Sequence, residues 1–324
     1  MAYAFVAVGV LLLFLGSELL LRGGIGLFKA AGLSPLLIGL FVVSAATSAP
    51  EFSVVLQSVA AKAPELGVAD VIGSNIINLL LVLGLGALVR PLPSPPKIAF
   101  RDGGALLLAS IALAGIVVLF AFTQHAGFAL LGGFAIYLVV SFITDWRRSA
   151  HLSVSEARAQ CRDYNHSATV NLFLLALGAV SLLFGARCLV DGALVLAPLL
   201  HMSKAITGLT IVALATALPE MVVVFGISRR GWDNITVGHL LASSVFNILA
   251  VLGFAAAIHP FALPHDFAHV DVYVLVGVAV LLLPLMITSW RLTRWNGALL
   301  VLCYGLYGVF LAWRLGYVAL PHFG

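Results

Sequence analysis

Ten apolar segments constrain this chain more than any other feature of its sequence. A helix needs roughly 20 residues to cross the hydrocarbon core of a bilayer. Since 62% of the 324 residues are hydrophobic and only 9% are charged, the composition is typical of a membrane protein. We therefore predict an all-α integral membrane protein with ten transmembrane helices in a lipid bilayer. The segments lie near residues 2–22, 34–60, 68–90, 104–122, 127–146, 168–191, 204–228, 236–258, 271–289 and 297–315.

A polar linker, residues 147–167, separates a first group of five segments (1–146) from a second group of five (168–324). If successive helices alternate in direction, thirteen of the 17 Lys and Arg residues lie on the side of this linker. Because basic residues accumulate in cytoplasmic loops, the linker is predicted to be cytoplasmic and both termini non-cytoplasmic. The thirteen are Arg22, Lys29, Arg90, Lys97, Arg101, Arg147, Arg148, Arg158, Arg162, Arg229, Arg230, Arg291 and Arg294.

Several functional classes lack support in the sequence. Cys161, Cys188 and Cys303 are far apart and form no CxxC pattern, which argues against a disulfide framework or a zinc site. No phosphate-binding G-x-x-x-x-G-K pattern points to ATP-driven transport. The charge balance does not indicate nucleic-acid binding, and no His, Cys or Ser constellation indicates an enzyme. We expect neither catalysis nor a resident cofactor.

The two groups of segments are copies of one unit at an offset of 169 residues. Pro50 and Glu51 fall on Pro219 and Glu220, a match that the shared apolar composition does not explain. The offset also relates Ser74 to Ser243 and Asn78 to Asn247. Since each unit has an odd number of helices, the second copy must enter the membrane from the opposite side. Such inverted repeats, with a substrate site between them, are typical of secondary transporters.

Glu51 and Glu220 are the residues that point most directly to function. Each lies inside a long apolar run, where an unpaired carboxylate costs at least a few kcal/mol. Intramembrane acidic residues commonly mark ion pathways, and no basic residue lies nearby in the sequence to pair with them. A bound cation could supply the missing charge.

The prolines beside these glutamates predict broken helices. Because proline lacks an N–H group and clashes with the carbonyl four residues earlier, the carbonyls of Ala46 and Ala215 should lose their helical partners. Irregular backbone at membrane depth is tolerated where it lines a cavity, and broken helices of this kind coordinate ions in transporters.

The neighbouring polar side chains all offer oxygen. The i, i+4 spacing places side chains on one helix face, and it recurs in four pairs. Oxygen ligands suit calcium or sodium better than zinc or copper. Two glutamates balance one divalent cation, two monovalent cations or two protons, as an exchanger requires. The pairs are Thr47 with Glu51, Thr216 with Glu220, Ser74 with Asn78, and Ser243 with Asn247.

These segments resemble the cation/calcium exchanger superfamily, whose two repeats carry a G-T-S-x-P-E segment followed by G-S-N-x-x-N or G-S-N-x-x-D. Here residues 46–51 read A-T-S-A-P-E and residues 73–78 read G-S-N-I-I-N, while 215–220 read A-T-A-L-P-E and 242–247 read A-S-S-V-F-N. The ten-helix plan is similar to that of the prokaryotic sodium/calcium exchangers.

The resemblance implies five plus five helices, with the second, third, seventh and eighth forming the ion site. It further implies a prokaryotic inner-membrane antiporter that exchanges Ca²⁺ for Na⁺ by alternating access, in which the first and sixth helices slide across this core. The implied roles are shared Ca²⁺ and Na⁺ ligation by Glu51 and Glu220, backbone carbonyls of Thr47 and Thr216, Na⁺-binding oxygens of Ser48, Ser74 and Ser243, and completion of the centre by Asn78 and Asn247.

Ala217 departs from the family pattern, because a serine usually occupies this position and would contribute a hydroxyl to a sodium site. This departure keeps Ca²⁺/H⁺ exchange through the same glutamates open as an alternative. The proton-coupled relatives usually carry a G-N-x-x-E type signature, which is missing here, and sodium is therefore the leading expectation. A cation channel, which would also use intramembrane carboxylates, is the rival from another class.

Overall fold

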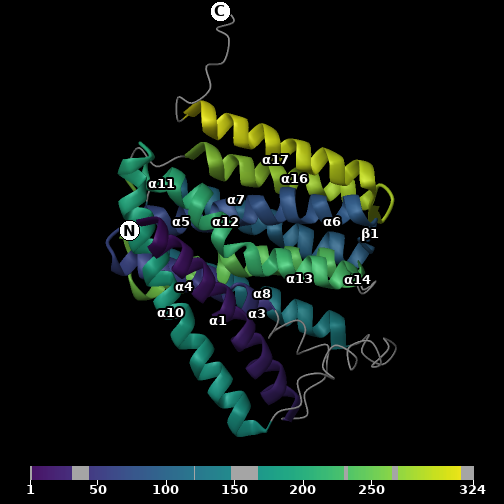
Figure 1. Ribbon diagram of the computed structural model, residues 1–324. Helices are drawn as coiled ribbons and strands as arrows, with labels where there is room; N and C mark the ends of the chain where they lie inside the picture. Colours follow the sequence, from purple (N-terminus) through teal and green to yellow (C-terminus); the bar gives the residue numbers. More distant parts are fainter. Residues whose placement is uncertain are drawn as a thin grey trace, which may run out of the picture.

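The computed structural model describes residues 2–30, 44–119, 121–146, 167–229, 233–264 and 269–314. The chain is helical apart from four two-residue strands and short connections (Figure 1). Its first half comprises α1 (Ala2–Ala30), α3 (Ser44–Thr47), α4 (Ala49–Ala60), α5 (Pro64–Ile76), η2 (Ile77–Val82), α6 (Leu83–Val89), β1 (Leu92–Pro93), η3 (Ile98–Gly103), α7 (Gly104–Val118), β2 (Ala121–Phe122) and α8 (Gln124–Trp146).

The second half follows a similar order of elements. It comprises α10 (Ala168–Leu199), α11 (Lys204–Thr207), η4 (Gly208–Val212), α12 (Ala213–Thr216), α13 (Leu218–Arg229), α14 (Asp233–Phe246), η5 (Asn247–Val251), α15 (Leu252–Ile258), β3 (Phe261–Ala262), α16 (His269–Ile287), β4 (Arg291–Leu292) and α17 (Arg294–Arg314).

Within the described residues, eight helices are long and apolar enough to cross a membrane, and a ninth is obtained if the bent pair in residues 204–224 counts as one span. The all-α membrane class is thus confirmed. Of the expected segment 34–60, the part from Ser44 onward is described and helical. Residues 147–166 of the expected linker lie outside the described residues.

Two of the spans form the centre of the molecule. The span Pro64–Val89, made of α5, η2 and α6, is 83% buried, and Thr236–Ile258, made of α14, η5 and α15, is 78% buried. By contrast, the spans at α1, α8 and α17 are only 22% buried. Apolar side chains such as Leu108 and Ile136, exposed by 70% and 67%, face outward, as expected of a surface in contact with lipid.

The outer helices of each half pack on the inner helices of the other half. In particular, α17 packs on α6 and α8 packs on α15, while α7 and α16, one from each half, pack on each other. The strands also pair across the two halves, since β1 pairs with β4 and β2 pairs with β3, both antiparallel. At the second of these sheets, the rings of Phe122 and Phe261 stack with centroids 4.8 Å apart.

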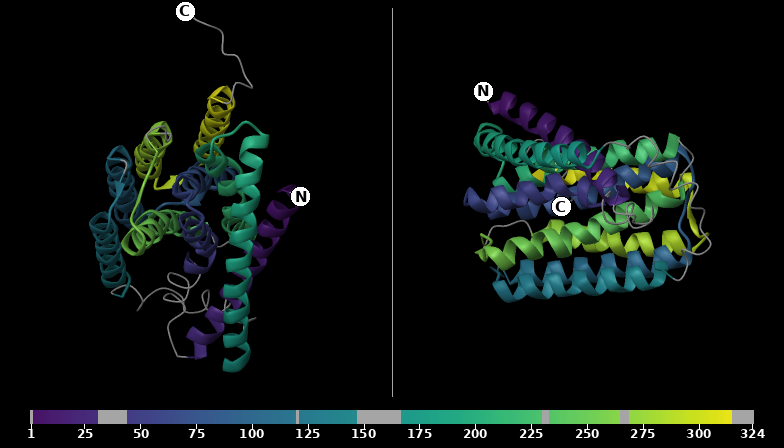
Figure 2. Two further views of the ribbon diagram at one scale, coloured as in Figure 1. Left: turned by 90° about the vertical axis from the view of Figure 1, so that its left-hand side faces the viewer. Right: turned by 90° about the horizontal axis from the view of Figure 1, so that it is seen from below.

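The helices α1 and α10 lie side by side at one edge of the molecule (Figures 1 and 2). Glycines at intervals of seven residues allow this close approach. A Cβ atom added to Gly9 would lie 2.9 Å from the carbonyl oxygen of Gly185, and one added to Gly16 would lie 3.0 Å from that of Gly178. Since the 169-residue offset relates Gly9 to Gly178 and Gly16 to Gly185, the two helices present the same face to each other.

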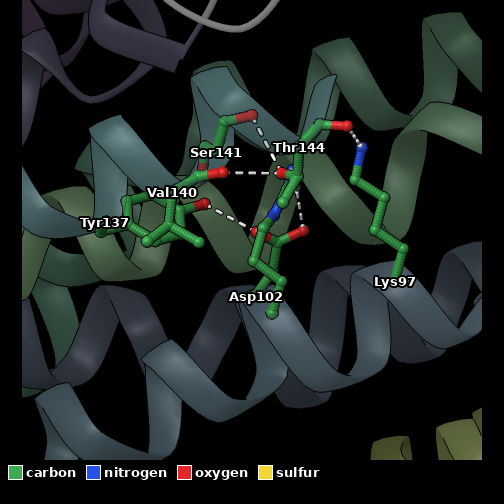
Figure 3. A network of polar contacts seen from close by, with 7 residues as sticks. Lys97, Asp102, Tyr137, Val140, Ser141 and Thr144 are labelled. Atoms are coloured by element: carbon green, nitrogen blue, oxygen red, sulfur yellow. Dashed lines mark hydrogen bonds and ion pairs between the residues drawn. The ribbon is translucent and has the colours of Figure 1, made fainter. Parts of the chain in front are cut away.

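Asp102, at the start of the α7 span, is buried in a polar network that attaches this span to α8 (Figure 3). Arg101 Nε donates a 2.7 Å hydrogen bond to Asp102 Oδ1, which also accepts a 2.9 Å bond from the Tyr137 hydroxyl. Lys97 Nζ donates to the backbone carbonyl of Thr144 at 3.0 Å. The network therefore joins the basic end of one span to the C-terminal turn of the next.

Asp271, which the offset relates to Asp102, lies in a matching network on α16. The hydroxyl of Tyr307 donates to its Oδ1 at 2.9 Å, and Arg314 Nη1 donates to its Oδ2 at 2.7 Å. Here the arginine comes from the far end of α17 and not from the neighbouring position. Both buried aspartates thus have a tyrosine and an arginine partner.

Candidate cation site

The two proline-glutamate segments interrupt their helices as the sequence predicts. Ser48 forms a bend (φ −86°, ψ 2°) between α3 and α4, with Pro50 in the first turn of α4. In the second half, α12 and α13 meet at Ala217 with a bend of 40°. Each break lies next to a buried glutamate, Glu51 or Glu220.

The carbonyl of Ala46 shows the effect of the proline directly. Pro50 has no N–H group to donate to it. Instead, the hydroxyl of Ser17 on α1 donates a 2.7 Å hydrogen bond to this oxygen. The offset relates Ser17 to Ala186, which has no hydroxyl and cannot make the corresponding bond to Ala215.

All the ligands expected from the sequence lie in the interior, each with at most 1% of its surface exposed. Ser48 and Ser243 are in direct contact, with their hydroxyl oxygens 2.8 Å apart. Ser243 also donates a 3.2 Å hydrogen bond to Glu220 Oε1, and Thr47 lies within hydrogen-bonding range of Glu220. Tertiary packing thus joins the helix break between α3 and α4 to α13 and α14 of the other half.

Glu51 is the least satisfied member of this group. Within the described part of the chain, neither of its carboxylate oxygens has a hydrogen-bond partner, and Glu220 Oε2 has none either. The two glutamates are close enough to interact electrostatically. Buried polar groups in proteins are nearly always partnered, and buried charges are paired or coordinate metals. These oxygens are therefore available to a cation.

Asn78 and Asn247 lie where the two central spans become π-helical. Asn78 is in η2, and Asn247 begins η5. Single π-helical turns inside α-helices are frequent at functional sites. The amide oxygens and nitrogens of both residues have no partner among the described residues.

Three expected ligands make contacts that the sequence spacing did not predict. Thr47 approaches Glu220 of the other half, because the bend at Ser48 interrupts the i, i+4 register between Thr47 and Glu51. The hydroxyl of Ser74 donates to the carbonyl of Val71 in its own helix at 3.3 Å. Thr216 turns away from Glu220 toward another carboxylate.

That carboxylate belongs to Asp70, which the sequence reading missed. The Thr216 hydroxyl donates a 2.9 Å hydrogen bond to Asp70 Oδ1, and Asp70 is completely buried. It lies four residues before Ser74, at the start of an apolar run, so the reasoning applied to Glu51 would also have identified it. The offset relates it to His239, which is buried as well.

The described basic side chains that form ion pairs do so with other acids. Lys204 pairs with Glu65 at 3.0 Å, and further pairs join Arg22 to Glu18, Arg101 to Asp102, Arg187 to Asp191 and Arg314 to Asp271. The described residues also contain no group of three His, Cys, Asp or Glu side chains arranged to hold a metal ion. A cation here would be bound by glutamates together with hydroxyl, amide and carbonyl oxygens, which suits calcium and sodium.

Comparison with known proteins agrees with this chemistry. Residues 1–143 and 170–313 match the family model described as sodium/calcium exchanger protein. The inner membrane protein YrbG of Escherichia coli is 33% identical over 264 residues, covering 80% of this chain and 81% of its own length. The sodium/calcium exchanger MaX1 of Methanosarcina acetivorans is 25% identical, covering 91% and 94%. A solved structure of the sodium-calcium exchanger NCX_Mj superposes with a TM-score of 0.63 at 26% identity, covering 94% of this chain and 96% of that one.

Proposed function

The chain belongs to the sodium/calcium exchanger protein family, a family of membrane transporters, and we propose that it exchanges Ca²⁺ for Na⁺ across the membrane by alternating access. One observation carries the proposal. Glu51 and Glu220, both fully buried, approach each other at the breaks of two membrane helices. None of the ion pairs described above supplies a basic partner for either glutamate, and a bound cation would offset their charge.

We propose that the architecture is two inverted repeats of five helices, residues 1–146 and 168–324, joined by the linker 147–167. The exchanged strand pairs β1–β4 and β2–β3 support this arrangement. The facing glycines of α1 and α10 support it as well. Gly9 faces Gly185, the repeat mate of Gly16, and Gly16 faces Gly178, the repeat mate of Gly9.

The proposed ligands are Glu51 and Glu220 for both ions, with the backbone carbonyls of Thr47 and Thr216. Hydroxyls and amides supply further oxygens: Ser48, Ser74, Ser243, Asn78 and Asn247. The contacts from Ser48 to Ser243 and from Ser243 to Glu220 support this set, since they gather oxygen atoms from three helices.

Alternating access requires a site that is reached from one face at a time. A small recess lies beside Thr47 between α1 and α13 and includes Ser17 and Val223. The residues that the offset relates to Ser17 and Val223 are Ala186 and Val54, which lie in a buried hydrophobic cluster. In this conformation the recess thus reaches Thr47 at the first helix break, whereas the matching region of the other repeat is filled with apolar side chains.

We propose that the protein works in the inner membrane of a prokaryote, with both termini on the non-cytoplasmic side. The name of its relative YrbG, an inner membrane protein, supports the first part. The distribution of Lys and Arg along the sequence supports the second.

The second candidate is Ca²⁺/H⁺ exchange, in which Glu51 and Glu220 would accept protons. The observation that favours it is Ala217, which is buried between α12 and α13 and has no hydroxyl to offer to a sodium ion. A cation channel would use the same carboxylates but would need no counter-ion gradient.

Radiolabelled calcium uptake into proteoliposomes separates these functions. An outward Na⁺ gradient is compared with a proton gradient of matched size while the membrane potential is clamped. Sodium-driven uptake that is lost in Glu51→Gln and in Glu220→Gln, with both variants folded, is the expected result. Uptake driven only by protons would favour the second candidate, and flux without a counter-ion gradient would indicate a channel.

A further inference from the structure

Asp70 is a third buried carboxylate next to the proposed site. Only the first repeat has a carboxylate at this position, because the repeat mate of Asp70 is His239. The helix break that carries Thr216 packs closely on α5. A Cβ atom added to Gly208 would lie 3.2 Å from the backbone nitrogen of Asp70, and one added to Gly73 would lie 2.6 Å from the carbonyl oxygen of Leu209. These two glycines allow the approach that brings the Thr216 hydroxyl to 2.9 Å from Asp70 Oδ1.

Asp70 takes a hydrogen bond that repeat symmetry would assign to Glu51. Thr47 approaches the glutamate of the opposite repeat, Glu220, and by the same relation Thr216 would approach Glu51. Instead Thr216 bonds to Asp70, and Glu51 has no partner for either oxygen within the described residues. Asp70 Oδ2 is likewise buried and without a partner there.

The part of the site around Thr216 also lacks a hydroxyl that the other part has. Ser48 in the first repeat contacts Ser243, but its mate is Ala217, directly after Thr216. Correspondingly, Ser74, the mate of Ser243, turns to a backbone carbonyl of its own helix. The half of the site around Thr216 has therefore lost a hydroxyl at position 217 and gained a carboxylate at position 70.

The carboxylate of Asp70 adds a negative charge to the site. Asp70 lies within electrostatic range of both Glu51 and Glu220. Of the described basic groups on elements that pack on α5 or on its continuation η2, Lys204 is paired with Glu65 and Arg314 with Asp271. His239 on α14 is the repeat mate of Asp70, and His269 begins α16. Since unpaired intramembrane charges are costly, three carboxylates require three positive charges, of which one Ca²⁺ supplies two.

We propose that Asp70 is a cation ligand and forms, with Thr216 and Glu51, a subsite for one monovalent cation in which its carboxylate replaces the hydroxyl that Ala217 lacks. This inference rests on the proposed cation antiport. Three monovalent cations neutralise the three carboxylates, whereas Ca²⁺ alone leaves one negative charge. Asp70 therefore adds one monovalent cation to each exchange cycle.

The test measures Na⁺-driven and Na⁺-independent transport in proteoliposomes that contain the full chain. In Asp70→Asn we expect Ca²⁺–Ca²⁺ exchange to persist. The Na⁺ concentration for half-maximal Ca²⁺ exchange should rise about tenfold, since the charge of the ligands tunes cation affinity. The Na⁺ Hill coefficient should fall by about one. Adding Ala217→Ser to this variant returns a hydroxyl to the subsite and should recover part of the Na⁺ affinity.

Glu65→Gln is the matched control, because it removes a carboxylate from the same helix at the end that pairs with Lys204. We expect it to leave the Na⁺ dependence unchanged. Wild-type Na⁺ dependence in Asp70→Asn would overturn the inference, as would equal losses of Ca²⁺–Ca²⁺ and Na⁺/Ca²⁺ exchange in a folded protein. Absence of Ca²⁺ transport by the wild type under every gradient would instead contradict the proposed function itself.

Discussion

The hydroxyl of Ser17 donates a 2.7 Å hydrogen bond to the carbonyl oxygen of Ala46, and this bond joins α1 to the broken helix that carries Glu51. The carbonyl is available because Pro50, four residues later, has no N–H group. A helix expected to slide during transport is thus hydrogen-bonded directly to the backbone of the proposed site.

Ser17→Ala should strengthen Ca²⁺ binding. The carbonyl of Ala46 is a further candidate ligand, and the substitution leaves it without its partner in the cation-free state, so that it can turn to a cation without the loss of a hydrogen bond. Since a typical hydrogen bond contributes about 1 kcal/mol, we expect the Kd for Ca²⁺ to fall roughly fivefold, measured by calorimetric titration of the purified protein. Ser181→Ala is the control, because Ser181 makes a similar 2.8 Å bond to the Leu12 carbonyl between α1 and α10, away from the site. Weaker Ca²⁺ binding in Ser17→Ala would show that the hydroxyl supports the bound state instead.

Glu51→Gln should stabilise the cation-free protein more than Glu220→Gln does. Neither oxygen of Glu51 has a partner in the described structure, whereas Glu220 accepts a hydrogen bond from Ser243. Removing an unpartnered buried charge at position 51 should therefore raise the free energy of unfolding by about 1–3 kcal/mol. Thermal unfolding in detergent with a calcium chelator measures this difference. Added Ca²⁺ should raise the Tm of the wild type but of neither variant; a Ca²⁺-dependent rise in Glu51→Gln would show that this carboxylate is not a ligand.

Gly9→Ala should separate α1 from α10 and destabilise the protein. Its new Cβ atom would lie 2.6 Å from the backbone nitrogen of Leu189, a contact that neither helix can relieve without a backbone shift. Overpacking of this kind costs about 1–3 kcal/mol, so we expect a lower Tm. Gly132→Ala on α8 is the control, since its Cβ atom would meet no atom within 4 Å. A Tm for Gly9→Ala equal to that of the control would mean that the helix contact tolerates a methyl group.

Arg101→Ala and Arg314→Ala should be among the most destabilising surface-proximal substitutions. Each removes the guanidinium partner of a buried aspartate, Asp102 or Asp271, and leaves the tyrosine hydroxyl as the remaining partner among the described residues. Breaking one partner of a buried pair costs about 3–5 kcal/mol. The exposed pair of Arg187 and Asp191, at 3.8 Å, is the comparison, and its loss should cost about 0–1 kcal/mol. Similar unfolding temperatures for Arg101→Ala and Arg187→Ala would refute the expected role of burial.

The sequence by itself predicted the membrane class, the approximate positions of the spans and the two breaks next to Glu51 and Glu220. These features follow from local physics, because hydrophobic length and the missing N–H of proline act within a few residues of their own position. The argument that a carboxylate inside an apolar run needs a partner, which identified Glu51 and Glu220, would also have identified Asp70.

Tertiary structure decided which oxygens meet. Thr47 and Glu51 are four residues apart, but the bend at Ser48 directs Thr47 toward Glu220, and Thr216 bonds to Asp70 on another helix. Spacing along a helix determines which side chains share a face, but it carries no information about the facing helix. The distance between two facing helices is set by packing, above all where Gly73 and Gly208 let two helix backbones come close. The partner of each buried oxygen therefore depends on how the helices pack against one another.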